Sequence, residues 1–468
     1  MEHFIPSAEK LIPVDHGNEY FGQSAGKHFN MLAHGAVAGG DSHGTTVARQ
    51  VLLDGGNAVD AAVAAALALA VTCPQADHSG GGGCMNIHID GESYFLDYRQ
   101  TAPAATHGNR HPAGKEDGAQ DAAVPGTVMG LWVAHRRFGK RSWKDILRPA
   151  MALAHTGFHA PGQMRKGGPQ AVGASGNANP PMDFSDGFFS IRGDALLAAY
   201  RAKWTKPLSF PWRGMQVLTA PPPSAGGMAL AQLLEIKSQQ HKTLFKGVRV
   251  NTASYIHLSS EMMKLALSES YAYLAEPEFS SRSADDFLPA ENLSMRATQV
   301  NALEIATAQA PQSRNSRNHI THFSVIDQWG NAVSNTCALR DAGTGALSLS
   351  APTILLKDGR VEMVLGTPGG AHIPTHLYQV LTNVFDYGLD LQCAVAARRF
   401  HHQLPQASFI VEEPYSPLPD RCVAELAKRG YSVQTAFFDT DVQAIHVVAR
   451  QPIPVADPRG RGWGVIAR

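Results

Sequence analysis

The sequence lacks an excess of charge of either sign and lacks a long apolar run. Its 468 residues contain 40 Lys and Arg against 40 Asp and Glu, so the formal net charge is +0. A balanced charge gives no electrostatic reason to expect nucleic acid or an anionic membrane as a partner. The longest apolar run, Ala58 to Val71, contains Asp60 and is shorter than the ~20 residues that cross a bilayer. We therefore expect no nucleic-acid partner and no membrane partner, and small molecules become the default ligands.

Cysteine is also scarce. The five cysteines are odd in number and widely spaced, and no two of them form a Cys-x-x-Cys pair. This spacing predicts reduced thiols, most of them buried, and indicates a cytoplasmic location. The first ten residues show no basic stretch followed by an apolar core, whereas a secretory signal has both. We therefore expect no secretory signal.

Metal and nucleotide motifs are missing as well. The sequence has no His-Glu-x-x-His motif and no Cys/His ligand spacing, so the adjacent His401 and His402 predict no metal site. The glycine run at 80–83 is not followed by Gly-Lys-Ser/Thr, which excludes a phosphate loop. Such a run lets the backbone pack closely, either as a tight strand entry or as the floor of a pocket. We expect no metal and no cofactor.

What is present includes a clear hairpin between Asn318 and Ser334. Apolar and polar residues alternate there, and Gly330 lies where a tight turn needs a positive φ. Because side chains alternate between the faces of a strand, Ile320 and His322 share one face and Thr321 lies on the other.

Helical and strand patterns alternate along the rest of the chain, which is typical of an α/β fold. Strands are predicted at Gly35–Ala38, Tyr94–Tyr98 and Gly462–Gly464, and helices at Thr45–Asp54, Ser142–Gly157, Asp194–Lys203, Met228–Lys237, Ser254–Leu274 and Pro374–Tyr387. The charged residues of the Ser254–Leu274 helix predict a solvated face.

Five stretches together resemble the γ-glutamyltranspeptidase family: Gly55–Val63, Val124–Trp132, the hairpin strand Thr321–Val325, Val364–Ala371 and Ala397–Gln403. The resemblance spans residues 34–468. It implies the four-layer αββα sandwich of the N-terminal-nucleophile hydrolases, with two stacked and mostly antiparallel sheets. We expect an irregular leader at 1–33 and one domain at 34–468, with a large-subunit-like part at 34–319 and a small-subunit-like part at 320–468.

The resemblance places Ile320 at the position of the family's nucleophile. There the precursor cuts itself before a Thr, whose hydroxyl then attacks a γ-glutamyl amide with the new α-amine as base. Isoleucine has no hydroxyl, so neither step can proceed through it, and we predict an uncut chain. Both residues are β-branched and favour strands, so the fold tolerates the replacement. Thr321 could substitute as the nucleophile only if a local bulge turned it to the other face.

Three further positions are assigned to the substrate site. Arg99 matches the family arginine that holds the substrate carboxylate, a task that suits a planar fork of donors. Gly369 and Gly370 match the turn whose amides stabilise the oxyanion. Ser348 is placed in the same site. After the hairpin the chain departs from the family, because Ala338 and Arg340 replace a Thr and an Asn.

A family segment that recognises the substrate ammonium is deleted after Gly345. We therefore expect a family member that has lost the ancestral activity and keeps a pocket for a small carboxylate or amide ligand. A homo-oligomer or a partner subunit is left open.

Two alternatives remain at this stage. One is an active γ-glutamyl or small-amide hydrolase or transferase on an uncut chain. Its candidate groups are the hydroxyls of Thr321, Ser348 and Ser350, with His322 or His372 as the base. The other is a scaffold that carries different chemistry in a biosynthetic pathway, through Cys337 or the histidines.

Overall fold

The structure is a computed structural model. It describes residues 34–73, 81–101, 124–158, 182–183, 190–191, 200–275, 288, 290–306, 320–338, 348–402, 404, 409–412 and 414–468. The expected leader at 1–33 lies outside these residues.

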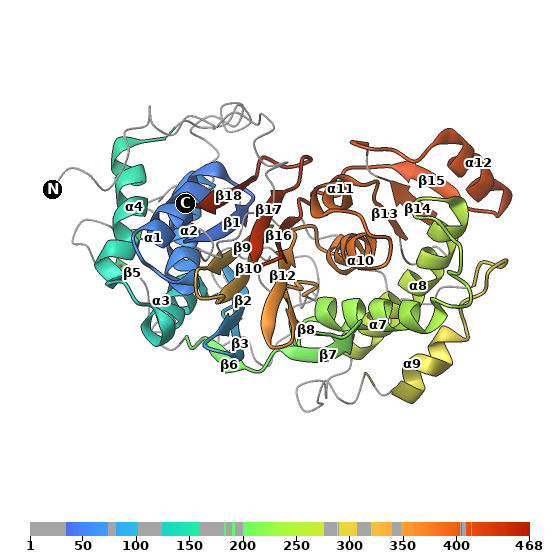
Figure 1. The fold of residues 1–468 in the computed structure, drawn as a ribbon, viewed down its shortest axis with the longest axis horizontal. Coiled ribbons are helices and arrows are strands. Elements are labelled where there is room, and N and C mark those ends of the chain that lie inside the picture. The colour runs from blue at the N-terminus through green and yellow to red at the C-terminus, as the bar shows by residue number, and fades with distance from the viewer. Residues whose placement is uncertain are drawn as a thin grey trace, which may run out of the picture.

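Two antiparallel sheets dominate the described part of the chain (Figure 1). The first sheet has seven described strands, which are, in spatial order, β18 (Trp463–Ala467), β1 (Gly35–Gly39), β9 (Ile320–Asp327), β10 (Ala332–Ala338), β2 (Gly82–Ile89), β3 (Glu92–Asp97) and β6 (Lys203–Thr205). Strands from the beginning, middle and end of the sequence therefore lie side by side. The order explains why the two parts expected from the resemblance share one sheet.

The second sheet has six described strands. They are β17 (Gln451–Ala456), β16 (Gln443–Val448), β12 (Arg360–Gly366), β11 (Thr353–Lys357), β8 (Met215–Thr219) and β7 (Leu208–Trp212). Two small sheets are formed by β13 (Phe400–His402), β14 (Phe409–Glu412) and β15 (Ser432–Thr435), and by β4 (Met182–Asp183) and β5 (Ser190–Ile191).

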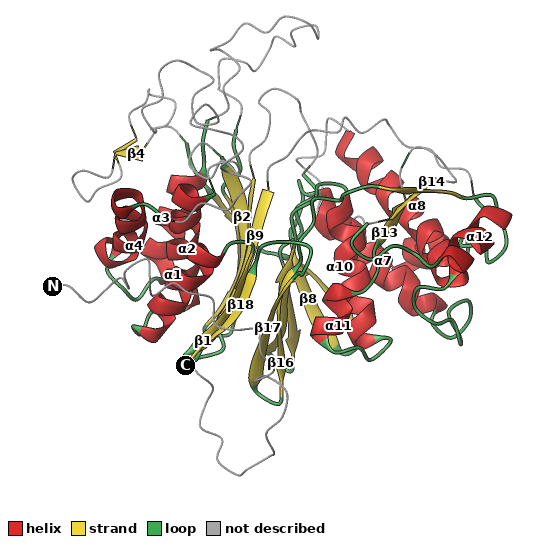
Figure 2. Ribbon diagram, turned by 90° about the horizontal axis from the view of Figure 1, so that it is seen from above, coloured by secondary structure: helices red, strands yellow, loops and turns green. Residues whose placement is uncertain are grey.

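Helices cover the outer face of each large sheet (Figure 2). On the first sheet lie α1 (Ser42–Leu53), α2 (Ala58–Thr72), α3 (Thr127–Phe138) and α4 (Trp143–Thr156). On the side of the second sheet lie α7 (Ala225–Gln240), α8 (Ala253–Ala275), α9 (Ala290–Ala297), α10 (His372–Phe385), α11 (Leu391–Ala396) and α12 (Asp420–Lys428). This arrangement confirms the four-layer αββα sandwich.

Alternating side chains explain the layers. In β9, Phe323 and Val325 join the apolar cluster that holds α2, whereas Ile326 joins a cluster between the two sheets. The Ala-rich α2 is apolar on all sides and is almost wholly buried, which is the expected state of a helix without a polar face. No described helix has both the length and the apolarity needed to cross a membrane.

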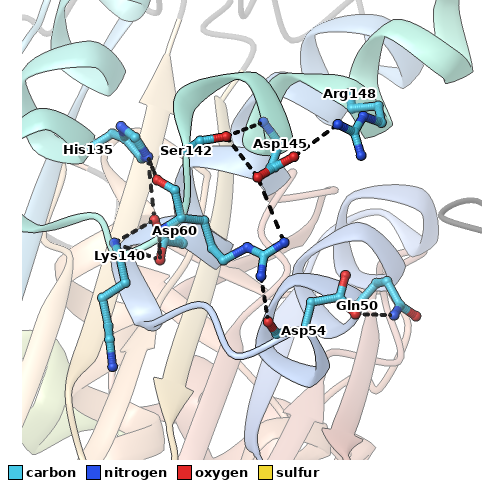
Figure 3. Close-up of polar contacts among 9 residues, drawn as sticks. Gln50, Asp54, Asp60, His135, Lys140, Ser142, Asp145 and Arg148 are labelled. Atoms are coloured by element: carbon cyan, nitrogen blue, oxygen red, sulfur yellow. Dashed lines mark hydrogen bonds and ion pairs between the residues drawn. The ribbon is translucent and has the colours of Figure 1, made fainter. Parts of the chain in front are cut away.

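Asp60 fixes the start of α2 to the connection between α3 and α4 (Figure 3). Its fully buried carboxylate accepts hydrogen bonds from the backbone amides of Asn57, Lys140 and Arg141. The Asn57 side chain in turn accepts from the Asp60 amide, which completes a capping box. The buried carboxylate is therefore compensated by amides of the helix ends, and the His135 Nε2 lies 3.5 Å from its Oδ1.

Two predictions about helices need correction. The charged residues of α8 do not face solvent: Glu261 and Lys264 are 2% and 3% exposed. Glu261 accepts from the Tyr431 hydroxyl and from the amide of Ala306, and Lys264 donates to the Ala306 carbonyl. We refer to these contacts as the α8 clamp. Burial is tolerated because each charge has a partner.

The helix predicted at Asp194–Lys203 does not reach its expected end, because Lys203 begins β6 and pairs with Asp97. Residues 194–199 of the predicted helix lie outside the described residues. Cys84, Cys337, Cys393 and Cys422 are free thiols, and the first, second and fourth of them are buried.

Candidate functional site

The register of the first sheet aligns a row of residues at one end of β9. Ala338 lies directly opposite Ile320, and Gly82 lies directly opposite Ala338. A side chain on Gly82 would meet the Arg99 Cα at 2.7 Å, so the backbone of Arg99 comes next in the row. Ile320 and Arg99 are therefore three strands apart, about 14 Å across the sheet. The glycine run is a tight strand entry at this point.

Ile320 and Thr321 lie on opposite faces of β9. The pairing with β10 runs in unbroken register from Ile320 to Ile326, so no bulge turns Thr321 around. Ile320 packs against the apolar cluster that carries α7, α8 and α10. Thr321 is 8% exposed, and its hydroxyl lies 3.3 Å from the place where a Cβ of Gly40 would be, at the start of the α1 layer. The predicted face assignment is therefore correct.

His322 lies on the same face as Ile320, but both ring nitrogens are engaged. Nδ1 lies 2.9 Å from the Thr336 hydroxyl, and Nε2 lies 3.2 Å from the Ser324 hydroxyl. The ring is pressed onto Gly366, where a Cβ would come within 2.1 Å of it. Burial lowers the pKa of His322 to about 3, so the imidazole is neutral at pH 7 and is a weak proton acceptor.

The turn after β12 contains Gly369 and Gly370, both with positive φ, at +120° and +57°. Their carbonyls accept hydrogen bonds from the amides of His372 and Ile373 and so start α10. Their own amides donate to no residue among those that the structure describes. Both glycines are half-buried. A pair of amides beside the start of a 14-residue helix can stabilise a negative charge.

Arg99 is already paired with a neighbouring carboxylate. Its Nε donates to Asp97 Oδ1 at 2.8 Å and its Nη2 donates to Asp97 Oδ2 at 2.5 Å. Burial acts to lower the pKa of Arg99, but the hydrogen bonds and charge of Asp97 outweigh it and raise that pKa. Nη1 donates to no described residue. One edge of the guanidinium is therefore held by Asp97.

Ser348 lies in a segment that is fixed to the start of α7. Its carbonyl accepts from the Ala225 amide and from the Ser224 hydroxyl, which also donates to the Ser350 carbonyl at 2.6 Å. Because Thr353 pairs with Leu365, this segment lies at the same end of the second sheet as Gly366. The structure thus places Ser348 at the end of the sandwich that carries the glycine turn.

Four assigned positions lie at this end of the sandwich: Ile320, Arg99, Ser348 and the Gly369–Gly370 turn. Thr321 is separated from them by the sheet, and Arg340 lies outside the described residues. Cys337 is fully buried on the far face, 3.1 Å from Asn335 Nδ2 and 3.5 Å from the Tyr98 hydroxyl. Burial raises the pKa of its thiol, which disfavours a reactive thiolate.

Known proteins resemble the chain along nearly its whole length. The family model described as Gamma-glutamyltranspeptidase matches residues 44–174, 194–346 and 340–467. A glutathione hydrolase proenzyme from Pseudomonas aeruginosa is 36% identical, over 93% of this chain and 95% of the relative. The chain belongs to the γ-glutamyltranspeptidase family.

Solved structures agree with this membership. A γ-glutamyltranspeptidase from Pseudomonas nitroreducens, complexed with L-DON, is 37% identical with a TM-score of 0.50, over 57% of this chain and 94% of that chain. A cephalosporin acylase from Bacillus halodurans has a TM-score of 0.74 at 20% identity, over 97% of this chain and 99% of that chain. The second likeness supports the N-terminal-nucleophile hydrolase fold alone.

Sequence reasoning about this family member missed two features of the site. The contact of the His322 ring with Gly366 could not be anticipated, because it joins strands from different sheets. The pairing of Arg99 with Asp97 had a local signal, since residues two apart on a strand share a face. The sequence reasoning did not use that signal.

Proposed function

We propose that this γ-glutamyltranspeptidase family member neither cuts itself nor transfers γ-glutamyl groups, and that it binds a small carboxylate beside the Gly369–Gly370 turn. Residues 34–468 then form one uncut domain. The observation that carries the proposal is the position of Ile320, which opens β9 opposite Ala338 with no hydroxyl on either side chain.

The neighbouring groups support the loss of the ancestral chemistry. The hydroxyl of Thr321 lies on the far face of the sheet, and His322 is a weak base because burial lowers its pKa. An attack on an amide carbonyl needs a nucleophile and a base within hydrogen-bond reach of each other on one side of the substrate. Ile320, Ala338 and the buried His322 do not supply that pair.

The anion-binding part of the site supports the ligand. Among the described residues, the amides of Gly369 and Gly370 have no acceptor and Arg99 Nη1 has no hydrogen-bond partner. A carboxylate can accept from either group with charge-assisted geometry. Asp97 partly neutralises Arg99, so we expect modest affinity for a single carboxylate.

Denaturing gel electrophoresis tests the absence of processing. We expect one band of about 50 kDa for the purified chain. Two fragments that meet at Ile320 would refute the proposal. A γ-glutamyl anilide reporter should release no product above the rate of a buffer blank.

The variant Ile320→Thr tests whether the missing oxygen is the whole cause. We expect the single variant to remain uncut, because Ala338 still faces it without a hydroxyl. The double variant Ile320→Thr/Ala338→Thr adds a hydroxyl at both paired positions and tests whether the two together restore self-cleavage. Ile320→Val serves as the matched control without a hydroxyl. Self-cleavage of the single variant would show that the other departures from the family are unimportant.

Isothermal titration tests the ligand. We expect glutarate and glutamate to bind with equal affinity, since the segment that recognises the ammonium is absent. Arg99→Gln should weaken binding at least about tenfold, because a bidentate charge-assisted contact is lost. Arg136→Gln, on the exposed face of α3, is the control and should change nothing. The absence of heat from every carboxylate would contradict the proposed pocket.

The alternative of an active hydrolase has its own test. Turnover of a small-amide or γ-glutamyl reporter that is abolished by Thr321→Ala would favour that function, and the same result for Ser348→Ala would identify Ser348 as the nucleophile.

A further inference from the structure

The connection between α3 and α4 concentrates positive charge. Residues 136–148 contain six basic residues and one acidic residue, in a chain whose formal net charge is +0. Five of the basic side chains are exposed, and together with Trp132 they form what we call the basic face: Trp132, Arg136, Arg137, Lys140, Lys144 and Arg148. Helical spacing of four residues places Trp132 and Arg136 in one row on α3 and Lys144 and Arg148 in one row on α4, and Lys140 lies in the connection between the two helices.

The single acidic residue of this segment is already occupied. Asp145 accepts from the Ser142 hydroxyl and from Arg148, and Arg141 approaches it at 3.8 Å. Figure 3 shows Arg148 and Ser142 both directed at Asp145. Asp145 therefore compensates Arg148, whereas Arg136, Arg137, Lys140 and Lys144 have no acidic partner within residues 136–148.

Tryptophan accompanies the charge. Trp132 is 37% exposed and stacks edge-to-face on Trp143 at 5.0 Å between ring centroids. The Lys140 ammonium lies 3.6 Å from the ring centroid of Trp329, which is 47% exposed in the turn between β9 and β10. Exposed tryptophan beside Lys and Arg is typical of proteins at the membrane–water interface, where the ring has one apolar and one wet side.

The basic face is held rigidly. The amides of Lys140 and Arg141 donate to the buried Asp60, and Arg141 Nη1 donates to the Asp54 carbonyl at 2.9 Å. α3 and α4 belong to the outermost layer of the sandwich (Figure 2). Binding would therefore require little ordering of the backbone.

We propose that the basic face docks the protein on a membrane surface that contains anionic phospholipids. The occupant follows from charge complementarity combined with exposed tryptophan. A single-stranded nucleic acid would be favoured by a basic groove with stacked aromatic rings, whereas these side chains lie on an outer helical layer. This surface association involves no membrane-spanning segment and is independent of the proposed carboxylate pocket.

Vesicle sedimentation tests the proposal. The full chain is mixed with vesicles of phosphatidylcholine alone or with phosphatidylglycerol added. We expect binding only to the anionic vesicles, and release at about 1 M salt, where the Debye length falls to about 3 Å. Each Lys or Arg near an anionic leaflet strengthens partitioning by about fivefold, so Arg136→Glu/Lys140→Glu/Lys144→Glu should weaken it at least about a hundredfold.

A matched control carries the same change in net charge elsewhere. Lys246→Glu/Lys357→Glu/Lys428→Glu changes three exposed lysines on other elements and should keep at least about a third of the wild-type partitioning. Trp132→Ala separates the aromatic from the ionic part and should weaken binding about threefold or more. If the first triple variant fails to fold, the salt dependence and Trp132→Ala still decide the matter.

Three results would overturn the proposal: no sedimentation with anionic vesicles, equal losses in both triple variants, or binding to a single-stranded oligonucleotide with no binding to vesicles.

Discussion

The Asp60 junction and the Ile320 end of β9 differ in whether their polar groups have hydrogen-bond partners. At the junction, a buried carboxylate accepts from three backbone amides and a capping box is complete. At the Ile320 end, hydrocarbon faces hydrocarbon across the strand pair, and the glycine amides beyond β12 have no described acceptor. The first region maintains the fold, and the second is where we propose that the nucleophile position of the family lies.

The difference indicates what the chain retains. The contacts of the Asp60 carboxylate are kept, because a buried charge that loses its partners would lower stability by several kcal/mol. A change between threonine and isoleucine at position 320 carries no comparable loss of stability, since isoleucine fits a strand as well as threonine does. Loss of an alcohol at Ile320 is therefore compatible with an intact sandwich.

The largest effect is expected from Asp60→Ala, which removes the feature that defines the first region. Three amides, one buried and two partly buried, would lose their acceptor, and we expect a loss of about 4 kcal/mol or more in the free energy of unfolding. Chemical denaturation of the two proteins measures it. Asp54→Ala is the control, with an expected loss of about 1 kcal/mol or less. Equal losses would remove the contrast between the regions.

The second prediction concerns acid. Burial lowers the pKa of His322 to about 3 and that of His372 to about 4, from an ordinary value of 6.5. Between the folded and the unfolded pKa of each histidine, the unfolded chain binds more protons than the folded chain does. The stabilisation that depends on a neutral imidazole is therefore complete above pH 6.5 and falls as the pH decreases. We expect each imidazole to remove about 2 kcal/mol at pH 5.

Urea midpoints at pH 7.5 and 5 check this prediction, and His322→Gln should flatten the dependence. Asp441 acts in the opposite sense. Burial raises its pKa to about 7, so its contribution is complete below pH 3.8 and is lost as the pH rises through 7. Asp441→Asn should therefore steepen the loss of stability in acid. An unchanged pH profile in both variants would contradict the assignment.

The third prediction compares two glycines of the reacting end. Gly366→Ala would press a Cβ into the His322 ring, so we expect a loss of about 2 kcal/mol. Gly370→Ala meets no atom within 4 Å but has φ at +57°, so we expect about 1 kcal/mol from backbone strain. Thermal unfolding measures which of the two variants loses more stability. A smaller loss for Gly366→Ala than for Gly370→Ala would show that the His322 ring moves aside at little cost.

The smallest effect is expected from Thr321→Val. The two side chains have the same shape, and the Thr321 hydroxyl has no hydrogen bond among the described residues. We expect a change of less than about 0.5 kcal/mol in stability and unaltered carboxylate binding. A large loss of binding would move Thr321 into the site.

Much of this contrast could be predicted from the sequence, because strand alternation has a fixed period. The period placed Ile320 and Thr321 on opposite faces, and the hairpin turn at Gly330 fixed the register that brings Ala338 opposite Ile320. The fold came from motifs distributed over the whole chain. These parts depend on local spacing, which a single sequence displays.

The rest depends on contacts between distant segments. Glu261 and Lys264 look like solvated charges on α8 until Tyr431 and Ala306 are placed beside them. The basic face was hidden for a different reason, since a net charge of +0 averages over the molecule. Composition reports totals, and docking depends on where the charges are located.

The α8 clamp determines how the chain would respond to a protease. It ties the backbone of Ala306 to the side chains of Glu261 and Lys264 on α8 by two hydrogen bonds, while β9 is held between β1 and β10. If a peptide bond between Ala306 and Ile320 were broken, Ala306 and Ile320 would both remain attached to the same body through these contacts. The two pieces would migrate together through a gel-filtration column, and the cut would appear only after unfolding.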